Sequence, residues 1–276
     1  MIEGVRIGHW SDGEALTGCT AILLPDGSPA SGEVRGGAPA TREWELLAPQ
    51  RTVEQVDAVV LCGGSAFGLA ACDGVMRWLE EHDRGFPTPA GRVPIVVGAA
   101  LYDLDSGDAR VRPGAQEGYA ACDAAVDGRP ETGRVGAGTG ARVGRWRGPE
   151  SARPGALGVA VEEDGPLRVA AIVAVNAIGD LRERDVAASG PAAAGPREAT
   201  AIGAILTNAR LTKRDCLLLA QSGQDGLARA IEPAHTAFDG DALVAASCGG
   251  LEADTEQVRV LAARAVEAAV RSELEG

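Results

Sequence analysis

The pattern of apolar and polar residues in the first hundred positions predicts a buried strand, a helix and a second strand. Residues 56–62 (VDAVVLC) form a continuous apolar run that ends at two glycines, which is typical of a strand buried on both faces. Residues 93–98 (VPIVVG) predict another strand, which begins at Pro94 or lies on an edge of the sheet. Between them, residues 66–81 predict an amphipathic helix whose apolar face holds Phe67, Ala70, Val75, Trp78 and Leu79.

The middle of the chain predicts a hairpin, a linker and a further strand. Two apolar runs flank Asp164 and Gly165, which predicts antiparallel strands joined by a tight turn. Residues 186–199 are rich in Ala, Gly and Pro and carry no periodic pattern, so we expect an exposed, mobile linker. An apolar strand pattern resumes over residues 200–207.

The last part of the chain predicts two helices separated by a strand. Thr212 is a suitable N-cap for a helix over residues 213–231, residues 242–248 predict a strand, and residues 255–274 predict a closing amphipathic helix. The apolar faces are formed by Cys216, Leu217, Ala220, Leu227 and Ile231 in the first helix and by Val258, Leu261, Ala265, Ala269 and Val270 in the second.

Composition narrows the fold class and the partners. The 276 residues are 45% hydrophobic but only 3% aromatic and include 38 glycines, so the core must consist mainly of Ala, Val, Leu and Ile, which suits a layered α/β protein. A net charge of -13, without a basic run, argues against nucleic acid as a partner. Neither a signal peptide nor an apolar stretch of about 20 residues is present, so we expect a cytoplasmic protein without a membrane partner.

Cysteine and histidine usage gives no indication of a metal or cofactor. The six cysteines are scattered without a CxxC pair, so reduced and mostly buried thiols are expected. The three histidines lack ligand spacing, and we expect neither metal nor cofactor. Lys213 is the single lysine of the chain, so a lysine general base could only be this residue.

Two glycine-rich segments invite functional readings. Residues 63–68 follow a predicted strand but match none of three known motifs. A dinucleotide fingerprint requires glycine where Ser65 stands, and a P-loop requires lysine where Leu69 stands. A nucleophile elbow requires glycine where Phe67 stands. A structural turn is therefore favoured over Ser65 as a nucleophile. Residues 136–140 (GAGTG) could cradle an anion or let backbones approach closely, and the second reading is favoured.

Short segments spread along nearly the whole chain resemble one family, the self-processing L-aminopeptidase/D-amidase-esterase peptidases, which include β-aminopeptidases and a nylon-oligomer endohydrolase. Their order along the chain makes the resemblance specific. The segments are residues 4–9 (GVRIGH), 17–20 (TGCT), 34–39 (VRGGAP), 61–81, 92–96 (RVPIV), 136–141 (GAGTGA), 175–176 (VN), 179–180 (GD) and 235–241 (HTAFDGD).

The resemblance implies a fold and a maturation step. Members of this family form a four-layer α/β/β/α sandwich of the N-terminal-nucleophile type, similar to ornithine acetyltransferase-like folds, and cut themselves before a Ser or Thr. The matching bond here joins Ala199 to Thr200, which predicts one peptidase domain processed into an α subunit (1–199) and a β subunit (200–276). The new α-amine, with an ordinary pKa of about 7.7–8.0, could then serve as the base for the threonine hydroxyl.

The resemblance also implies roles for polar residues, each of which has a plain structural alternative. Asn176 would donate a hydrogen bond to the oxyanion, or it is simply a polar residue at a strand end. Asp239 and Asp241 would orient the nucleophile or its amine, and Tyr102 would contact the substrate or the intermediate. The alternatives are turn residues for the aspartates, since an isolated DGD is far short of a calcium loop, and a core-edge residue for Tyr102.

Several positions depart from the family pattern. Ala199 stands where Asn is usual before the cut, and Ala201 replaces a second hydroxyl residue. A basic position that is lysine in some members falls on Arg145 or, as the second choice, on Arg147. Arginine could stabilise an anion but could not act as a base.

These features predict an autoproteolytic N-terminal-threonine amidohydrolase or aminopeptidase. Its substrates would be short peptides or amides with a free or β-placed amine, which the acidic residues Asp239 and Asp241 would attract. Two alternatives stay open: an acyltransferase of the ornithine acetyltransferase type, and an unprocessed, non-catalytic family member. By resemblance we also expect a homo-oligomer, in the form of a tetramer.

Overall fold

The second half of the chain builds a five-stranded sheet around one strand that is buried on both faces. The computed structural model describes residues 1–182 and 198–274. In it, β15 (Thr200–Ala209) pairs antiparallel with β13 (Leu167–Asn176) and parallel with β17 (Ala242–Leu251). The outer strands are β12 (Ala156–Asp164), which is paired with β13, and β3 (Ala30–Val34), which is paired with β17. The predicted hairpin is confirmed, since Asp164 pairs with Leu167 and leaves Gly165 in the turn at φ 59°.

The first half builds a six-stranded sheet centred on β5 (Ala58–Cys62). All five residues of β5 are buried. β5 pairs parallel with β8 (Val96–Ala100) and antiparallel with β2 (Thr17–Leu23). The remaining strands are β1 (Arg6–Asp12), β4 (Ala40–Arg42) and β9 (Val126–Asp127).

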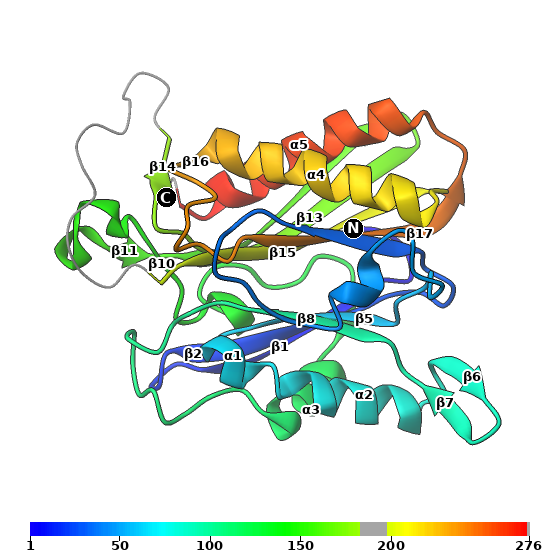
Figure 1. Cartoon of the computed structure of the whole chain (residues 1–276), viewed down its shortest axis with the longest axis horizontal. Coiled ribbons are helices and arrows are strands. Elements are labelled where there is room, and N and C mark those ends of the chain that lie inside the picture. Colours follow the sequence, from blue (N-terminus) through cyan, green and yellow to red (C-terminus); the bar gives the residue numbers. More distant parts are fainter. Residues whose placement is uncertain (183–197, 275–276) are drawn as a thin grey trace.

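The two sheets pack face to face between two layers of helices (Figure 1). α4 (Lys213–Ala230) and α5 (Thr255–Ser272) cover the five-stranded sheet, and α2 (Ala71–Glu81) and α3 (Ala115–Asp123) cover the six-stranded sheet. The α/β/β/α sandwich expected from the resemblance is therefore confirmed. Among the residues described, no helix is long and apolar enough to cross a membrane.

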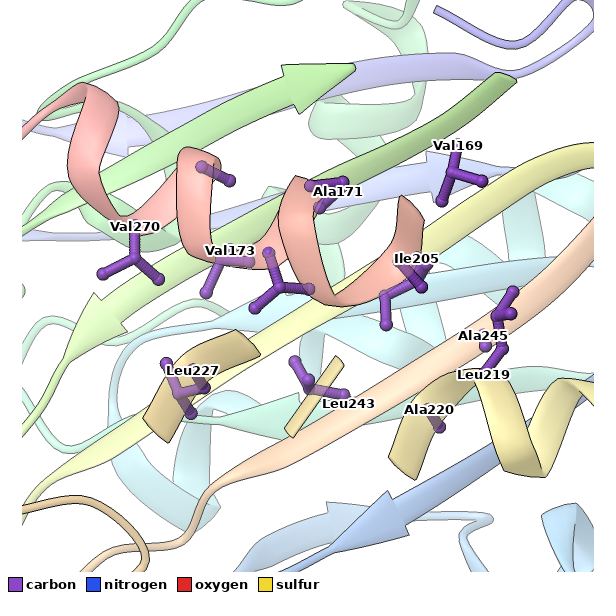
Figure 2. Close-up of a cluster of buried hydrophobic side chains, with 14 of the residues drawn as sticks. Val169, Ala171, Val173, Ile205, Leu219, Ala220, Leu227, Leu243, Ala245 and Val270 are labelled. Atoms are coloured by element: carbon purple, nitrogen blue, oxygen red, sulfur yellow. The ribbon is translucent and has the colours of Figure 1, made fainter. Parts of the chain in front are cut away.

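Alternation along β15 places its side chains in two different hydrophobic cores. Ile202 and Leu206 face the core between the sheets, whereas Ala201 and Ile205 face the core beneath α4 and α5. Figure 2 shows the second of these cores, in which side chains of three neighbouring strands meet those of both helices. The labelled residues are Val169, Ala171, Val173, Ile205, Leu219, Ala220, Leu227, Leu243, Ala245 and Val270.

The helix expected over residues 66–81 is wrong in one respect, because the structure divides it. A short α1 (Ser65–Gly68) precedes α2, and the two expected apolar residues of the first part, Phe67 and Ala70, are exposed. Gly68 lies so close to the preceding turn that an added Cβ would be 1.8 Å from the Gly63 carbonyl oxygen. This tight turn directs Phe67 outward, where the Arg112 guanidinium lies 4.0 Å from its ring centroid.

The strand expected over residues 93–98 is also divided. Val93 ends β7 (Gly91–Val93), which forms an exposed hairpin with β6 (Phe86–Thr88), and β8 begins only at Val96. Pro94 has no N–H for a strand ladder, which explains the break at this position.

The other predicted strands and helices match the structure to within a few residues. The thiols of all six cysteines are free, and five of them are buried while Cys248 is half-buried. Most of the expected linker lies outside the described residues, but its last residue, Ala199, is buried rather than exposed. Short strands complete the fold: β10 (Arg142–Val143), β11 (Arg153–Pro154), β14 (Asp180–Leu181) and β16 (Ile231–Glu232).

Candidate active site

Thr200 opens β15 at the end of the strand that faces the 236–241 turn. It is 5% exposed and lies directly opposite Asn176 of β13 in the strand register. Its hydroxyl donates a hydrogen bond to the carbonyl oxygen of Ala199, with the two oxygens 2.5 Å apart. The hydroxyl therefore lies against the carbonyl group of the peptide bond that precedes it.

The Ala199 carbonyl has a second donor, the backbone N–H of Gly240, at 3.0 Å. Residue 240 must be small, because an added Cβ would lie 2.8 Å from the Thr200 hydroxyl oxygen. This backbone donor was not predicted, and the only sequence signal for it is a glycine between two aspartates. The Ala199 carbonyl is thus polarised by a backbone donor and lies beside a hydroxyl, which is the arrangement that acyl transfer requires.

The carboxylates of Asp239 and Asp241 are both buried and both bind backbone N–H groups. Asp241 accepts from the N–H of Ala201 at 2.8 Å, and Asp239 accepts from the N–H of Ile178 at 3.3 Å and from the hydroxyl of Thr236 at 2.7 Å. Burial, and then the nearby charge of Asp241, raises the pKa of Asp239 to about 6. The two aspartates thus connect the 236–241 turn to the start of β15 and to the end of β13.

His235 completes this acidic pair and was not singled out from the sequence. Its Nδ1 lies 2.8 Å from a carboxylate oxygen of Asp241, and its Nε2 lies 3.2 Å from the carbonyl oxygen of Gln224. Two acceptors favour an imidazolium that donates from both nitrogens. Burial lowers the pKa of His235, but the hydrogen bond to Asp241 and the charge of Asp241 outweigh it, and the pKa is raised above 6.5.

Asn176 uses its side-chain amide to connect three segments. Its Oδ1 accepts from the N–H of Arg142 at 2.8 Å, and its Nδ2 donates to the carbonyl oxygen of Tyr102 at 2.9 Å. An amide nitrogen carries two hydrogens, so this contact leaves a second N–H on the nitrogen. Asn176 is therefore held firmly opposite Thr200.

Arg145 is almost fully buried and contacts the chain two residues before Thr200. Its Nη1 donates to the carbonyl oxygen of Glu198 at 2.8 Å, and its Nη2 lies 3.3 Å from Asp105. Burial lowers the pKa of Arg145, although arginine keeps its proton in proteins. Arg147, the other candidate for this basic position, is exposed.

Tyr102 lies near the same group of charges. Burial, and then the negative charges of Asp105 and Glu198, raises the pKa of its hydroxyl. The carbonyl oxygen of Tyr102 thus holds the Asn176 side chain, and its hydroxyl lies close enough to Arg145 to feel the charge of the guanidinium.

Lys213 cannot supply a base at this site. Its ammonium donates to three backbone carbonyls, those of Leu46, Arg51 and Val53, at 2.7 to 3.2 Å. These contacts hold the start of α4 against the 46–53 segment. The residue therefore serves the fold and not the chemistry around Thr200.

The loop of residues 136–140 matches the close-packing alternative. An added Cβ would lie 2.2 Å from the Thr20 hydroxyl at Gly136 and 1.9 Å from a backbone carbonyl at Gly140. The N–H groups of Gly136 and Ala137 already donate to Ser11 and Thr20 hydroxyls. Within residues 1–182 and 198–274, no three His, Cys, Asp or Glu side chains are grouped as metal ligands.

The structure thus brings together most of the predicted site residues from segments far apart in sequence. Thr200, Ala199 and Asn176 meet at the start of β15, where Asp241 binds Ala201 and Asp239 binds the end of β13. Arg145 joins this group through Glu198, and Tyr102 joins it through Asn176.

Comparison with known proteins gives matches over nearly the whole chain. A family model described as peptidase family S58 matches residues 2–275. The chain is 44% identical over 290 residues to the uncharacterized aminopeptidase ML1167 of Mycobacterium leprae, covering 91% of this chain and 78% of the relative. It is 30% identical to the 6-aminohexanoate-oligomer endohydrolase of Paenarthrobacter ureafaciens, covering 91% of this chain and 75% of that protein.

Solved structures share the fold. A Burkholderia sp. beta-aminopeptidase aligns with a TM-score of 0.74 at 24% identity, over 98% of this chain and 83% of that chain. The L-aminopeptidase D-Ala-esterase/amidase from Ochrobactrum anthropi, described as a variant of the Ntn hydrolase fold, aligns with a TM-score of 0.72 at 20% identity, with the same coverage.

Proposed function

Because this chain belongs to peptidase family S58, we propose that it is an amide hydrolase that cuts itself before Thr200 and then uses this threonine as an N-terminal nucleophile. One observation carries the proposal. The Thr200 hydroxyl lies against the Ala199 carbonyl, whose oxygen also accepts the N–H of Gly240. A nucleophile, an acyl group and an oxyanion donor therefore meet at one peptide bond.

Self-cleavage would begin with attack of the Thr200 hydroxyl oxygen on the Ala199 carbonyl carbon. The bond from that carbon to the Thr200 nitrogen breaks, the proton of the hydroxyl passes to the nitrogen, and an ester forms. This step frees the Thr200 α-amine. Water then hydrolyses the ester, which releases the Ala199 carboxylate and restores the Thr200 hydroxyl. The Gly240 N–H would stabilise the charge that develops on the carbonyl oxygen during both steps.

Turnover would follow the same route with an external amide. The α-amine of Thr200, with an ordinary pKa of about 7.7–8.0, takes the proton of its own hydroxyl and passes it to the leaving amine. This choice of base suits the site, because Lys213 is bound to backbone carbonyls elsewhere and Arg145 keeps its proton.

The polar residues around Thr200 would hold these groups in place. We assign the remaining N–H of Asn176 to the oxyanion, since Asn176 lies opposite Thr200. Asp241 would fix the position of β15 through the N–H of Ala201, and Asp239 would fix the turn that carries Gly240. Tyr102 would border the substrate next to Arg145.

Short peptides or other amides are the proposed substrates. Relatives named as an aminopeptidase and as an oligomer endohydrolase support this class. The chain would mature into residues 1–199 and 200–276, with cleavage after Ala199, at a position where asparagine is usual in the family pattern described above.

The mass of the purified protein under denaturing conditions tests the proposal. Wild type should show two pieces that join at Ala199 and Thr200, and Thr200→Ser should show the same pieces because serine keeps the hydroxyl. Thr200→Ala should stay as one chain and should not hydrolyse alanine p-nitroanilide or its N-acetyl form, because it lacks the nucleophile. Hydrolysis by Thr200→Ala would overturn the assignment of the nucleophile, and a wild type that stays intact after long incubation would overturn self-cleavage.

A further inference from the structure

Residues 198–200 of the uncut chain occupy the acyl side of the site as a short parallel bridge. Ala199 bridges to Asp239: its N–H donates to the Phe238 carbonyl at 3.4 Å, and its carbonyl accepts from Gly240 at 3.0 Å. One residue further upstream, the Glu198 carbonyl accepts from Arg145 at 2.8 Å. The chain thus displays how an acyl segment is bound when its carbonyl lies beside the Thr200 hydroxyl.

Arg145 is the charged contact of this segment, and it is poorly compensated. Its side chain is only 3% exposed, its ion pair with Asp105 is 3.3 Å long, and Asp105 itself is 37% exposed. Among the residues that the structure describes, none accepts a hydrogen bond from the buried Nε of Arg145. A desolvated guanidinium loses free energy for every N–H that lacks an acceptor.

Cleavage would remove a further partner from this guanidinium. Once the upstream residues leave the site, Nη1 loses the Glu198 carbonyl and needs another oxygen acceptor. An amide carbonyl or a carboxylate at the same position would supply one. A substrate that ends in a free α-ammonium would instead place a positive charge next to the buried guanidinium, whose ion pair with the half-exposed Asp105 is 3.3 Å long.

The two aspartates do not counter this effect directly. Both oxygens of Asp241 already accept hydrogen bonds, from Ala201 and from His235, and both oxygens of Asp239 accept from Ile178 and Thr236. Their carboxylates are committed to the fold of the turn.

We propose, on the basis of the function proposed above, that Arg145 makes this enzyme select acyl groups that carry a carbonyl oxygen one residue upstream of the bond to be cut. Such substrates are N-acylated or internal residues of a peptide or oligoamide. Amides whose acyl residue ends in a free amine are bound less well. The acyl residue itself is small, since the Ala199 side chain that models it is buried.

Two matched probes test this selectivity on the processed enzyme: N-acetyl-alanine p-nitroanilide and alanine p-nitroanilide. The acetyl carbonyl of the first probe would take the place of the Glu198 carbonyl. The second probe has no carbonyl there, and its ammonium nitrogen would take the place of the Ala199 nitrogen. We expect wild type to show a kcat/KM at least about tenfold higher for the acetylated probe, because a hydrogen bond to a charged group contributes that much. Equal values, or a higher value for the free amine, would overturn the inference while leaving the proposed function intact.

Two variants assign the effect to the residue. Arg145→Met should lower the ratio of the two kcat/KM values about tenfold, mainly by raising KM for the acetylated probe. Arg147→Met removes an exposed arginine of the same short helical turn and should keep the wild-type ratio. An unchanged ratio in Arg145→Met would overturn the role of Arg145, and if this variant does not fold or mature, the wild-type ratio decides. Hydrolysis of neither probe by fully processed wild type would instead overturn the proposed function.

Discussion

At the scale of single residues, the candidate site is an arrangement of buried polar groups that support one another. Asp241 binds both the start of β15 and His235, and its charge adds to the burial that raises the pKa of Asp239. Buried carboxylates persist only where hydrogen bonds or counter-charges compensate them. His235 supplies that counter-charge to Asp241 and so helps to hold the 236–241 turn.

Asp239 should make the uncut chain less stable as the pH rises from about 4 to about 6. Burial, and then Asp241, raises its pKa from 3.8 to about 6, so the unfolded chain releases this proton at lower pH than the folded chain does. The free energy of unfolding therefore falls as the pH rises through this window. Urea denaturation at about pH 4 and pH 7 measures the decrease in the free energy of unfolding between these two pH values. This decrease should be larger in Thr200→Ala than in the same chain that also carries Asp239→Asn.

The constant cost of Asp239→Asn cancels in this comparison, because only the change between the two pH values is used. His235 titrates in both proteins and cancels in the same way. An identical pH dependence in the two chains would show that Asp239 has an ordinary pKa.

Gly240→Ala should slow self-cleavage on the order of 10²-fold, since small displacements of reacting groups are that costly. The added Cβ would lie 2.8 Å from the Thr200 hydroxyl oxygen and 2.8 Å from the Ala38 carbonyl oxygen, so the hydroxyl must move. The rate follows from the mass of freshly made protein over time. Gly13→Ala is the control, because a Cβ there meets no atom within 4 Å, and equal rates in the two variants would contradict the prediction.

At the scale of secondary-structure elements, α4 is fixed at its start by two local devices. Thr212 and Asp215 form a capping box, in which each side chain binds the backbone N–H of the other residue. Lys213 then binds three carbonyls of the segment that precedes β5. The first turn of α4 is thus tied to the segment that leads into β5.

Lys213→Met should lower the free energy of unfolding by about 1–3 kcal/mol, because it leaves three partly buried carbonyls without their ammonium donor. The three hydrogen bonds of 2.7 to 3.2 Å are lost, whereas the aliphatic part of the side chain is kept. Urea denaturation in the Thr200→Ala background measures the change in a single, uncut chain. Arg214→Met, which alters the exposed next residue, should have little effect, and equal losses in both variants would contradict this role of Lys213.

At the scale of the whole molecule, the cut before Thr200 would divide the chain but not the sandwich. β15 and β17 come from the second piece, yet they lie between β13 and β3 of the first piece. α4 and α5, also from the second piece, cover strands of both pieces (Figure 1). The two pieces therefore share one sheet and one hydrophobic core.

The two pieces should consequently stay together after cleavage. We expect them to elute as one species in native gel filtration, at the volume of uncut Thr200→Ala, and to separate only in denaturant. High salt should not separate them, because the shared core is apolar. Separation in native buffer would contradict the prediction, and the elution volume also tests the expected homo-oligomer.

The sequence by itself determined the elements whose pattern is local. The continuous apolar run of β15, the cap at Thr212 and the turn at Asp164 and Gly165 each depend on neighbouring residues, so they could be located without the fold. The sandwich and the choice of Thr200 were also predicted without the structure, but from short segments that resemble one family and not from a local pattern. Thr200 as the nucleophile stays a prediction.

Only the tertiary structure decided which distant groups meet. The Gly240 N–H reaches the Ala199 carbonyl, and Arg145 reaches Glu198, because sheet order and register bring these segments together. The division of residues 66–81 into two helices likewise depends on contact with the Gly63 turn. Periodicity records the local geometry of the backbone, whereas contacts between distant segments depend on how the layers pack, and no local pattern contains that information.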